Sequence, residues 1–145
     1  MPNYRIQEAE FDLPPNLHDK TVSIFSSSDT GKSEFNIVIS KDALKGATDL
    51  SKYVEHQIGE MKENFPDFEL LRKLNTNIGT AKAVALDYKW KSEKARLFQR
   101  QYVMIVHPPT GAAPYALMVT ATGAETLGKW EETFTNFMRN FSLRW

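Results

Sequence analysis

The stretch RLFQRQYVMIVHPP, residues 96–109, predicts one long β-strand that ends at a double proline. Alternate residues of a strand point to opposite faces of its sheet. One face of this strand carries Phe98, Arg100, Tyr102, Met104 and Val106, and the other carries Leu97, Gln99, Gln101, Val103 and Ile105. The second face mixes aliphatic side chains with two primary amides, so the pattern leaves open whether it is a plain structural face or a binding surface.

The segments around this strand predict further strands and a helix. Strands are expected at residues 4–14, 20–27, 33–40, 68–75, 80–92 and 115–122. Residues 48–65 change to the helical period, with apolar side chains at Leu50, Val54, Ile58, Met61 and Phe65. Thr48 or Asp49 can cap the start of this helix, and Pro66 ends it.

A second helix is expected near the end of the chain. Thr122 and Glu125 have the spacing of a capping box. An apolar stripe follows at Leu127, Trp130, Phe134, Phe137 and Phe141. A helix with so aromatic a stripe is typical of one that packs on a sheet, and a dimer contact is the alternative reading.

The order of these elements predicts an α+β fold, a mostly antiparallel β-sheet with two main helices packed on it. Residues 1–145 have the size of one domain, and the sequence contains no internal repeat or low-complexity tract.

The composition excludes several classes of protein. Lys plus Arg and Asp plus Glu both number 18, so the chain lacks the positive excess that nucleic-acid binding requires. It contains no cysteine, and no window approaches the ~20 apolar residues of a membrane-spanning helix. The N-terminal MPNYRIQEAEF lacks the features of a signal peptide, which favours a cytoplasmic location.

No catalytic constellation is present in the sequence. His18, His56 and His107 are widely spaced and form no metal-binding motif. TGKS at residues 30–33 lacks the upstream glycine of a phosphate-binding loop. The sequence therefore favours a protein that is not an enzyme and that holds no cofactor or metal.

A binding surface is the better-supported hypothesis. In the strand at 33–40, Phe35, Ile37 and Ile39 form an apolar core side, whereas Asn36, Val38 and Ser40 form a mixed face. In the first helix, Gln57 and Met61 lie four residues apart. Taken singly, each of these residues is explained as a half-exposed position of a sheet or helix with no binding role. Together with Gln99 and Gln101 they predict a concave surface that buries apolar groups and offers amide hydrogen bonds.

Four segments together resemble a known family. They are LPPNLHDKTVSIF (13–25), FNIVISKDAL (35–44), LSKYVEHQIGEM (50–61) and FQRQYVMI (98–105). Their order and spacing are similar to those of the Eag (effector-associated gene) chaperones of type VI secretion systems, which are small DcrB-like proteins of Gram-negative bacteria. The likeness covers nearly the whole chain and implies a Mog1/PsbP-like α+β sandwich.

The resemblance implies a specific function. Eag chaperones are cytoplasmic homodimers that shield the N-terminal transmembrane helices of a PAAR or Rhs effector until it is loaded on the VgrG spike. Carried onto this chain, the binding groove comprises Val22, Ile24, Val38, Ser40, Gln57, Met61 and Gln101. Gln99 joins this set on geometry alone. Two alternatives remain: a Mog1-type adaptor that binds a folded partner through charged surface, and a ligand-binding or structural DcrB-like domain.

Overall fold

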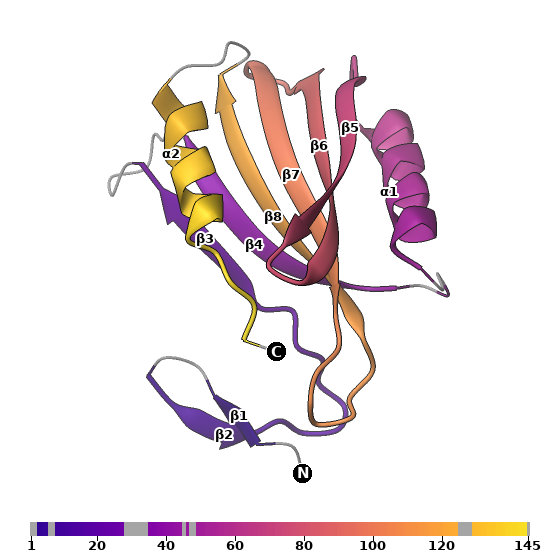
Figure 1. Cartoon of the computed structure of the whole chain (residues 1–145), viewed down its shortest axis with the longest axis vertical. Coiled ribbons are helices and arrows are strands. Elements are labelled where there is room, and N and C mark those ends of the chain that lie inside the picture. The colour runs from indigo at the N-terminus through magenta and orange to yellow at the C-terminus, as the bar shows by residue number, and fades with distance from the viewer. Residues whose placement is uncertain are drawn as a thin grey trace.

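Six antiparallel strands form the main sheet, and one helix lies on each of its faces (Figure 1). The computed structural model of the chain describes residues 3–5, 8–27, 35–44, 46, 49–124 and 129–144. The strands, in their order across the sheet, are β3 (Val22–Ser26), β4 (Asn36–Ala43), β8 (Tyr115–Ala124), β7 (Arg96–Val106), β6 (Ala81–Lys91) and β5 (Glu69–Ile78). The α+β class predicted from the sequence is confirmed.

Helix α1 (Leu50–Asn64) covers part of one face of the sheet, chiefly over β6 and β7. Asp49 caps its start by accepting a hydrogen bond from the Lys52 amide at 2.8 Å, and Pro66 follows its end, as predicted. The buried side chains of its inner stripe are Tyr53, Val54, Ile58 and Met61. They pack on the strands through Val84, Leu86, Tyr88, Val103 and Met118.

Helix α2 (Lys129–Arg139) covers the opposite face. Trp130 and Phe134 are buried there, which confirms the core reading of the aromatic stripe, and Phe137 and Phe141 pack at its margin. Leu127 and Glu125 lie outside the described residues. The predicted capping box is wrong, because Thr122 belongs to β8, where it pairs with Asn36 on one side and Gln99 on the other.

Gly123 lets α2 approach the sheet closely, because a Cβ atom there would lie 2.6 Å from Nε1 of Trp130. The indole is held between Phe35 and Phe98, with ring centroids 5.7 and 5.5 Å away. We expect Gly123→Ala to lower the free energy of unfolding by about 1–3 kcal/mol through overpacking.

Urea denaturation measures this effect, and Gly59→Ala is the matched control. Gly59 lies in α1 with open space around its Cα, so the same substitution should raise stability by about 0.5–1 kcal/mol through helix propensity. Equal effects of the two substitutions would contradict the close packing of Trp130 on Gly123.

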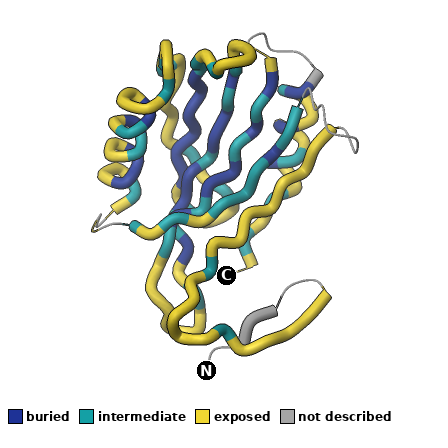
Figure 2. Tube along the Cα trace, turned by 180° about the vertical axis from the view of Figure 1, so that it is seen from behind, coloured by how far each residue is buried: buried dark blue, intermediate teal, exposed yellow. Residues whose placement is uncertain are grey.

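The first strands of the chain form a separate hairpin. β1 (Asn3–Arg5) pairs with β2 (Glu10–Asp12), and Figure 1 shows this hairpin beyond one end of the main sheet. The single strand predicted at residues 4–14 is therefore wrong, because the chain reverses between Arg5 and Glu10 so that the backbone of Tyr4 lies opposite that of Phe11. β2 and the segment leading to β3 are largely exposed (Figure 2).

Candidate binding face

The sheet face that bears α1 is only partly covered by that helix. Strand register aligns Ile24, Val38, Thr120, Gln101 and Leu86 in one row across five strands. α1 packs over the Leu86 end of this row, whereas Ile24 at the other end is 64% exposed. Figure 2 shows burial decreasing from the central strands to β3 at the sheet edge.

We call the part of this surface that lies beside α1, from β7 to β3, the open face. It comprises Val22, Ile24, Asn36, Val38, Ser40, Gln99, Gln101, Thr120 and Thr122. The structure thus brings together six of the eight residues predicted from the sequence: Val22, Ile24, Val38, Ser40, Gln99 and Gln101. They come from three strands, and their alternation places every one of them on the same side of the sheet.

The other two predicted residues lie on α1. Gln57 is half-buried, and its Nε2 lies 3.1 Å from Sδ of Met118 on β8. Met61 is 5% exposed and belongs to the core between α1 and the sheet. Gln57 is therefore accessible to a bound molecule, whereas Met61 is enclosed in the core and is not.

Gln99 has its hydrogen-bonding groups satisfied within the protein. Its Oε1 accepts from Nε1 of Trp90 at 2.8 Å, and its Nε2 donates to Oγ1 of Thr122 at 2.7 Å. This chain of bonds crosses β6, β7 and β8. These two bonds fix the amide of Gln99 in one orientation. Gln99 therefore links neighbouring strands and leaves no unpaired acceptor for a bound molecule.

Gln101 and Asn36 each retain an unused acceptor. Gln101 is 5% exposed and donates from Nε2 to Oγ1 of Thr120 at 2.9 Å, but its Oε1 is buried and unpaired. Oδ1 of Asn36 is also buried and unpaired. Among the described residues these are the two buried side-chain oxygen or nitrogen atoms without a partner. An unpaired buried carbonyl costs about 1–3 kcal/mol, which a bound molecule with N–H or O–H donors would recover.

The open face carries no charged side chain. At its border, the hydroxyl of Tyr53 donates to Oδ2 of Asp42. Burial raises the pKa of Tyr53 above its ordinary value, and the bond to Asp42 raises this pKa further, so the phenol stays neutral. Arg100, between the two glutamines in sequence, points to the opposite face and pairs with Asp87. The surface therefore combines aliphatic carbon with neutral amides and hydroxyls.

Asn36, Thr120 and Thr122 were not predicted as site residues. The alternation that singles out Val38 and Ser40 also includes Asn36. In YALMVTAT, residues 115–122, the two threonines alternate with alanine or valine in the same way. The missing information was the register, which places these threonines beside the two glutamines.

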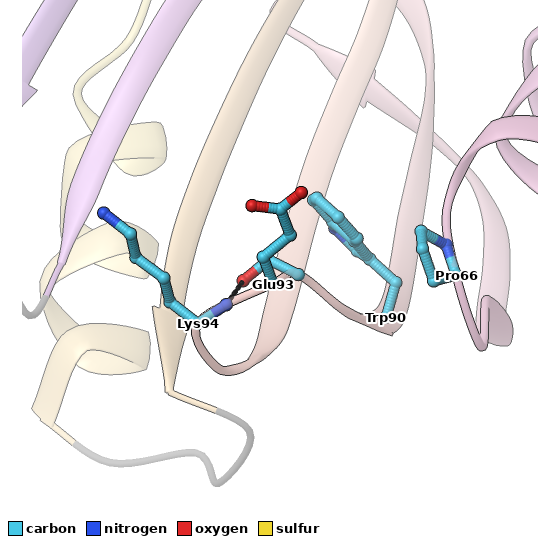
Figure 3. Close-up of a pocket in the computed structure, with 5 residues that line it drawn as sticks. Pro66, Trp90, Glu93 and Lys94 are labelled. Carbon is cyan, nitrogen blue, oxygen red and sulfur yellow. Dashed lines mark hydrogen bonds between the residues drawn. The ribbon is translucent and has the colours of Figure 1, made fainter.

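A shallow hollow of about 450 Å³ lies at the end of β6 (Figure 3). It is lined by Pro66, Trp90, Ser92, Glu93 and Lys94. Trp90 stacks on Phe65 at 4.4 Å, and its indole N–H donates to Gln99 of the open face. The hollow is thus joined to the open face through one hydrogen bond.

The part of the chain that the structure describes holds neither a metal-binding cluster nor a membrane-spanning helix. No three His, Asp or Glu residues are grouped there in a way that could hold a metal ion. No helix in the same residues is long and apolar enough to cross a membrane.

Comparison with known proteins gives consistent matches. Residues 8–136 match the family model named DcrB. A curated relative, Effector EagT6 of Pseudomonas aeruginosa, is 34% identical over 99 residues, which cover 68% of this chain and 69% of that protein.

Two solved structures are similar to this one. PA94 of Pseudomonas aeruginosa, described as a protein of unknown function, is 29% identical with a TM-score of 0.83, over 99% of this chain and 97% of its own. LpqN of Mycobacterium tuberculosis, described as involved in cell envelope biogenesis, is 18% identical with a TM-score of 0.51, over 85% of this chain and 81% of its own. The match to LpqN shows the shared fold alone. The family model and the match to EagT6 confirm the resemblance noted in the sequence, and the chain belongs to the DcrB family.

Proposed function

We propose that this protein is a type VI secretion effector chaperone that acts in the cytoplasm. It binds the N-terminal transmembrane helices of a PAAR or Rhs effector on the open face and shields them until the effector is loaded on the VgrG spike. The working unit is a homodimer, and the role involves binding without catalysis. The relationship to EagT6 supports the general role, and the chemistry of the open face supports the class of client.

The observation that carries the proposal is the composition of the open face beside α1. It combines aliphatic side chains with uncharged amides and hydroxyls, and it carries no charged group. A client helix of ~20 apolar residues in water exposes surface worth roughly 1.5–3 kcal/mol for each large side chain. Val22 and Ile24, at 50% and 64% exposure, offer aliphatic contact for such a helix. A charged surface would disfavour this contact, because each charge would lose its water.

The unpaired acceptors suggest which part of the client the face holds. The first four N–H groups of a helix have no partner within the helix, and a serine or threonine side chain adds an O–H donor. Oε1 of Gln101 and Oδ1 of Asn36 are buried in the free protein and would accept from such donors once their amide groups turn toward the client. The open face is therefore suited to an apolar helix at its N-terminal turn, or at a break in the helix.

Co-expression with the N-terminal fragment of a PAAR or Rhs effector tests the proposal. The expected result is a soluble complex that copurifies through a tag on either protein. The control is the same fragment with its apolar segments removed, which should not copurify. Recovery of the intact fragment only as insoluble protein, with the chaperone folded and alone in solution, would refute the proposed client.

Gln101→Met should separate client binding from stability. Methionine matches glutamine in length and removes both the buried, unpaired Oε1 and the hydrogen bond from Nε2 to Thr120. These two effects on stability oppose each other, so the melting temperature should change little. Affinity for a client peptide should fall roughly five- to a hundred-fold, which corresponds to one lost hydrogen bond of about 1–3 kcal/mol. Calorimetry with the peptide in mild detergent measures this loss. An unchanged affinity would show that Gln101 is a structural residue of the sheet.

A further inference from the structure

The outer edge of β3 presents unpaired main-chain groups. Ser27 donates its N–H to the Phe35 carbonyl at 2.9 Å, and Phe25 lies opposite Ile37. In an antiparallel pair the residues that point at the partner strand alternate, so the N–H and C=O groups of Val22 and Ile24 point away from β4. Among the described residues, no main-chain hydrogen bond reaches these two residues from outside the sheet.

The two edges of this sheet differ in how they are protected. On β5 the register shifts between Leu70 and Arg72, which marks a bulge. The same strand carries three charged side chains in ion pairs, Glu69 with Lys89, Arg72 with Asp87 and Lys73 with Glu55. Bulges and charges are the usual means of preventing a further strand from adding to an edge. The sequence of β3, VSIFS, has neither a charge nor a proline, and its register with β4 is regular.

Apolar side chains are exposed along β3 itself. Val22, Ile24 and Phe25 are 50%, 64% and 53% exposed. A strand edge alone contributes little area, whereas a stable interface buries about 1,600 Å² in total. Val22 and Ile24 on one face of β3, and Phe25 on the other, supply apolar contact on both sides of this edge.

We propose that β3 pairs antiparallel with β3 of a second copy, with Val22 opposite the partner's Ile24. This register satisfies the outward N–H and C=O groups of both residues in each copy, and it brings no charge to the centre of the interface. A two-fold axis beside Ser23 then joins both sheets into one, with the two open faces on the same side. Each binding site gains the partner's Val22 and Ile24. That two copies pair is part of the proposed function, on which this inference rests. What it adds is the strand through which they pair.

Ser23→Cys tests this register directly. In the proposed pairing Ser23 lies opposite the partner's Ser23 in a non-hydrogen-bonded pair, where Cα atoms are about 4.5 Å apart and a disulfide can form. The natural sequence has no cysteine, so any cross-link reports this position alone. Mild oxidation should convert most of the variant to a disulfide-linked dimer on non-reducing gels. Ser26→Cys, which is offset from its own copy in this register, should remain mostly monomeric. Equal cross-linking of the two variants, or none of Ser23→Cys, would overturn the proposal.

Ile24→Pro tests the main-chain contribution. Proline removes the outward N–H of Ile24 and is tolerated at a position whose N–H does not serve the ladder. Light scattering should give wild type and Ile24→Val a mass of twice 16.6 kDa, and Ile24→Pro a mass near 16.6 kDa, with unchanged circular dichroism. A monomeric wild type, or a folded Ile24→Pro that remains dimeric, would overturn edge pairing. Both tests use the protein without client. If the protein copurifies with an effector fragment but the cross-linking and light-scattering results are negative, the edge pairing is refuted and the proposed client stands.

Discussion

Asp87→Asn is expected to lower the free energy of unfolding by about 3–5 kcal/mol. Asp87 is 6% exposed and Arg100 is 8% exposed, on the sheet face that carries α2. Nε and Nη2 of Arg100 donate to the two carboxylate oxygens at 2.8 and 3.0 Å. These bonds raise the pKa of Arg100 above its ordinary value in the wild type. In the variant the guanidinium stays charged without them, because the ordinary pKa of arginine is already far above neutral. Asparagine keeps the shape of the side chain but leaves this buried charge without its main partner.

Chemical denaturation of two further variants separates the buried pair from its surroundings. Glu131, whose side chain is 37% exposed, accepts from Nη1 of Arg100 at 3.1 Å, and Glu131→Gln should cost less than about 1 kcal/mol. The double variant Asp87→Leu with Arg100→Met removes both buried charges and should recover much of the stability lost in Asp87→Asn. A loss in Asp87→Asn no larger than that in Glu131→Gln would contradict this account.

Regular hydrophobic patterns made the sheet and both helices predictable. The spacing of Val54 and Ile58 in α1, and of Trp130 and Phe134 in α2, marked the faces that are buried in the structure. Arg100 was placed on the correct face by alternation, but its role was not predictable. Its partners Asp87 and Glu131 lie 13 and 31 residues away, and only the strand register and the docking of α2 bring them together.

The candidate site was predictable as a set of positions but not as a hydrogen-bond network. Alternation within each strand grouped Val38 with Ser40 and Gln99 with Gln101, because every residue of a strand follows the same period. The family resemblance then placed the two groups in one groove. Which amide is satisfied depends on neighbours in the next strand. Register gives Gln99 two partners and leaves Oε1 of Gln101 without one. Met61 was predicted to line the groove, but it is buried in the core. Helical spacing does not distinguish a buried residue of an apolar stripe from one at the border of that stripe.

Val38→Asp should reduce affinity for a client helix by more than about a hundred-fold. Val38 lies in the middle of the open face, between Ile24 on β3 and Thr120 on β8. It is partly exposed in the free protein, so the new carboxylate can remain hydrated and the fold should persist. An apolar helix that covers this position would remove water from the charge and offer no cation to replace it.

Leu74→Asp and Val38→Thr are the controls for this loss. Leu74 on β5 is 49% exposed but pairs with Ala85 on the other face, so an aspartate there should leave affinity unchanged. Val38→Thr keeps the side-chain shape and adds only a hydroxyl, which the neutral groups of the open face tolerate, so the loss should stay below about ten-fold. Calorimetry with one client peptide, together with circular dichroism of each variant, gives the comparison. If folded Val38→Asp and Leu74→Asp bind the peptide with equal affinity, the client does not dock on the open face. If only Val38→Asp loses affinity, the client helix covers position 38, because Val38→Thr alters the same position without adding a charge.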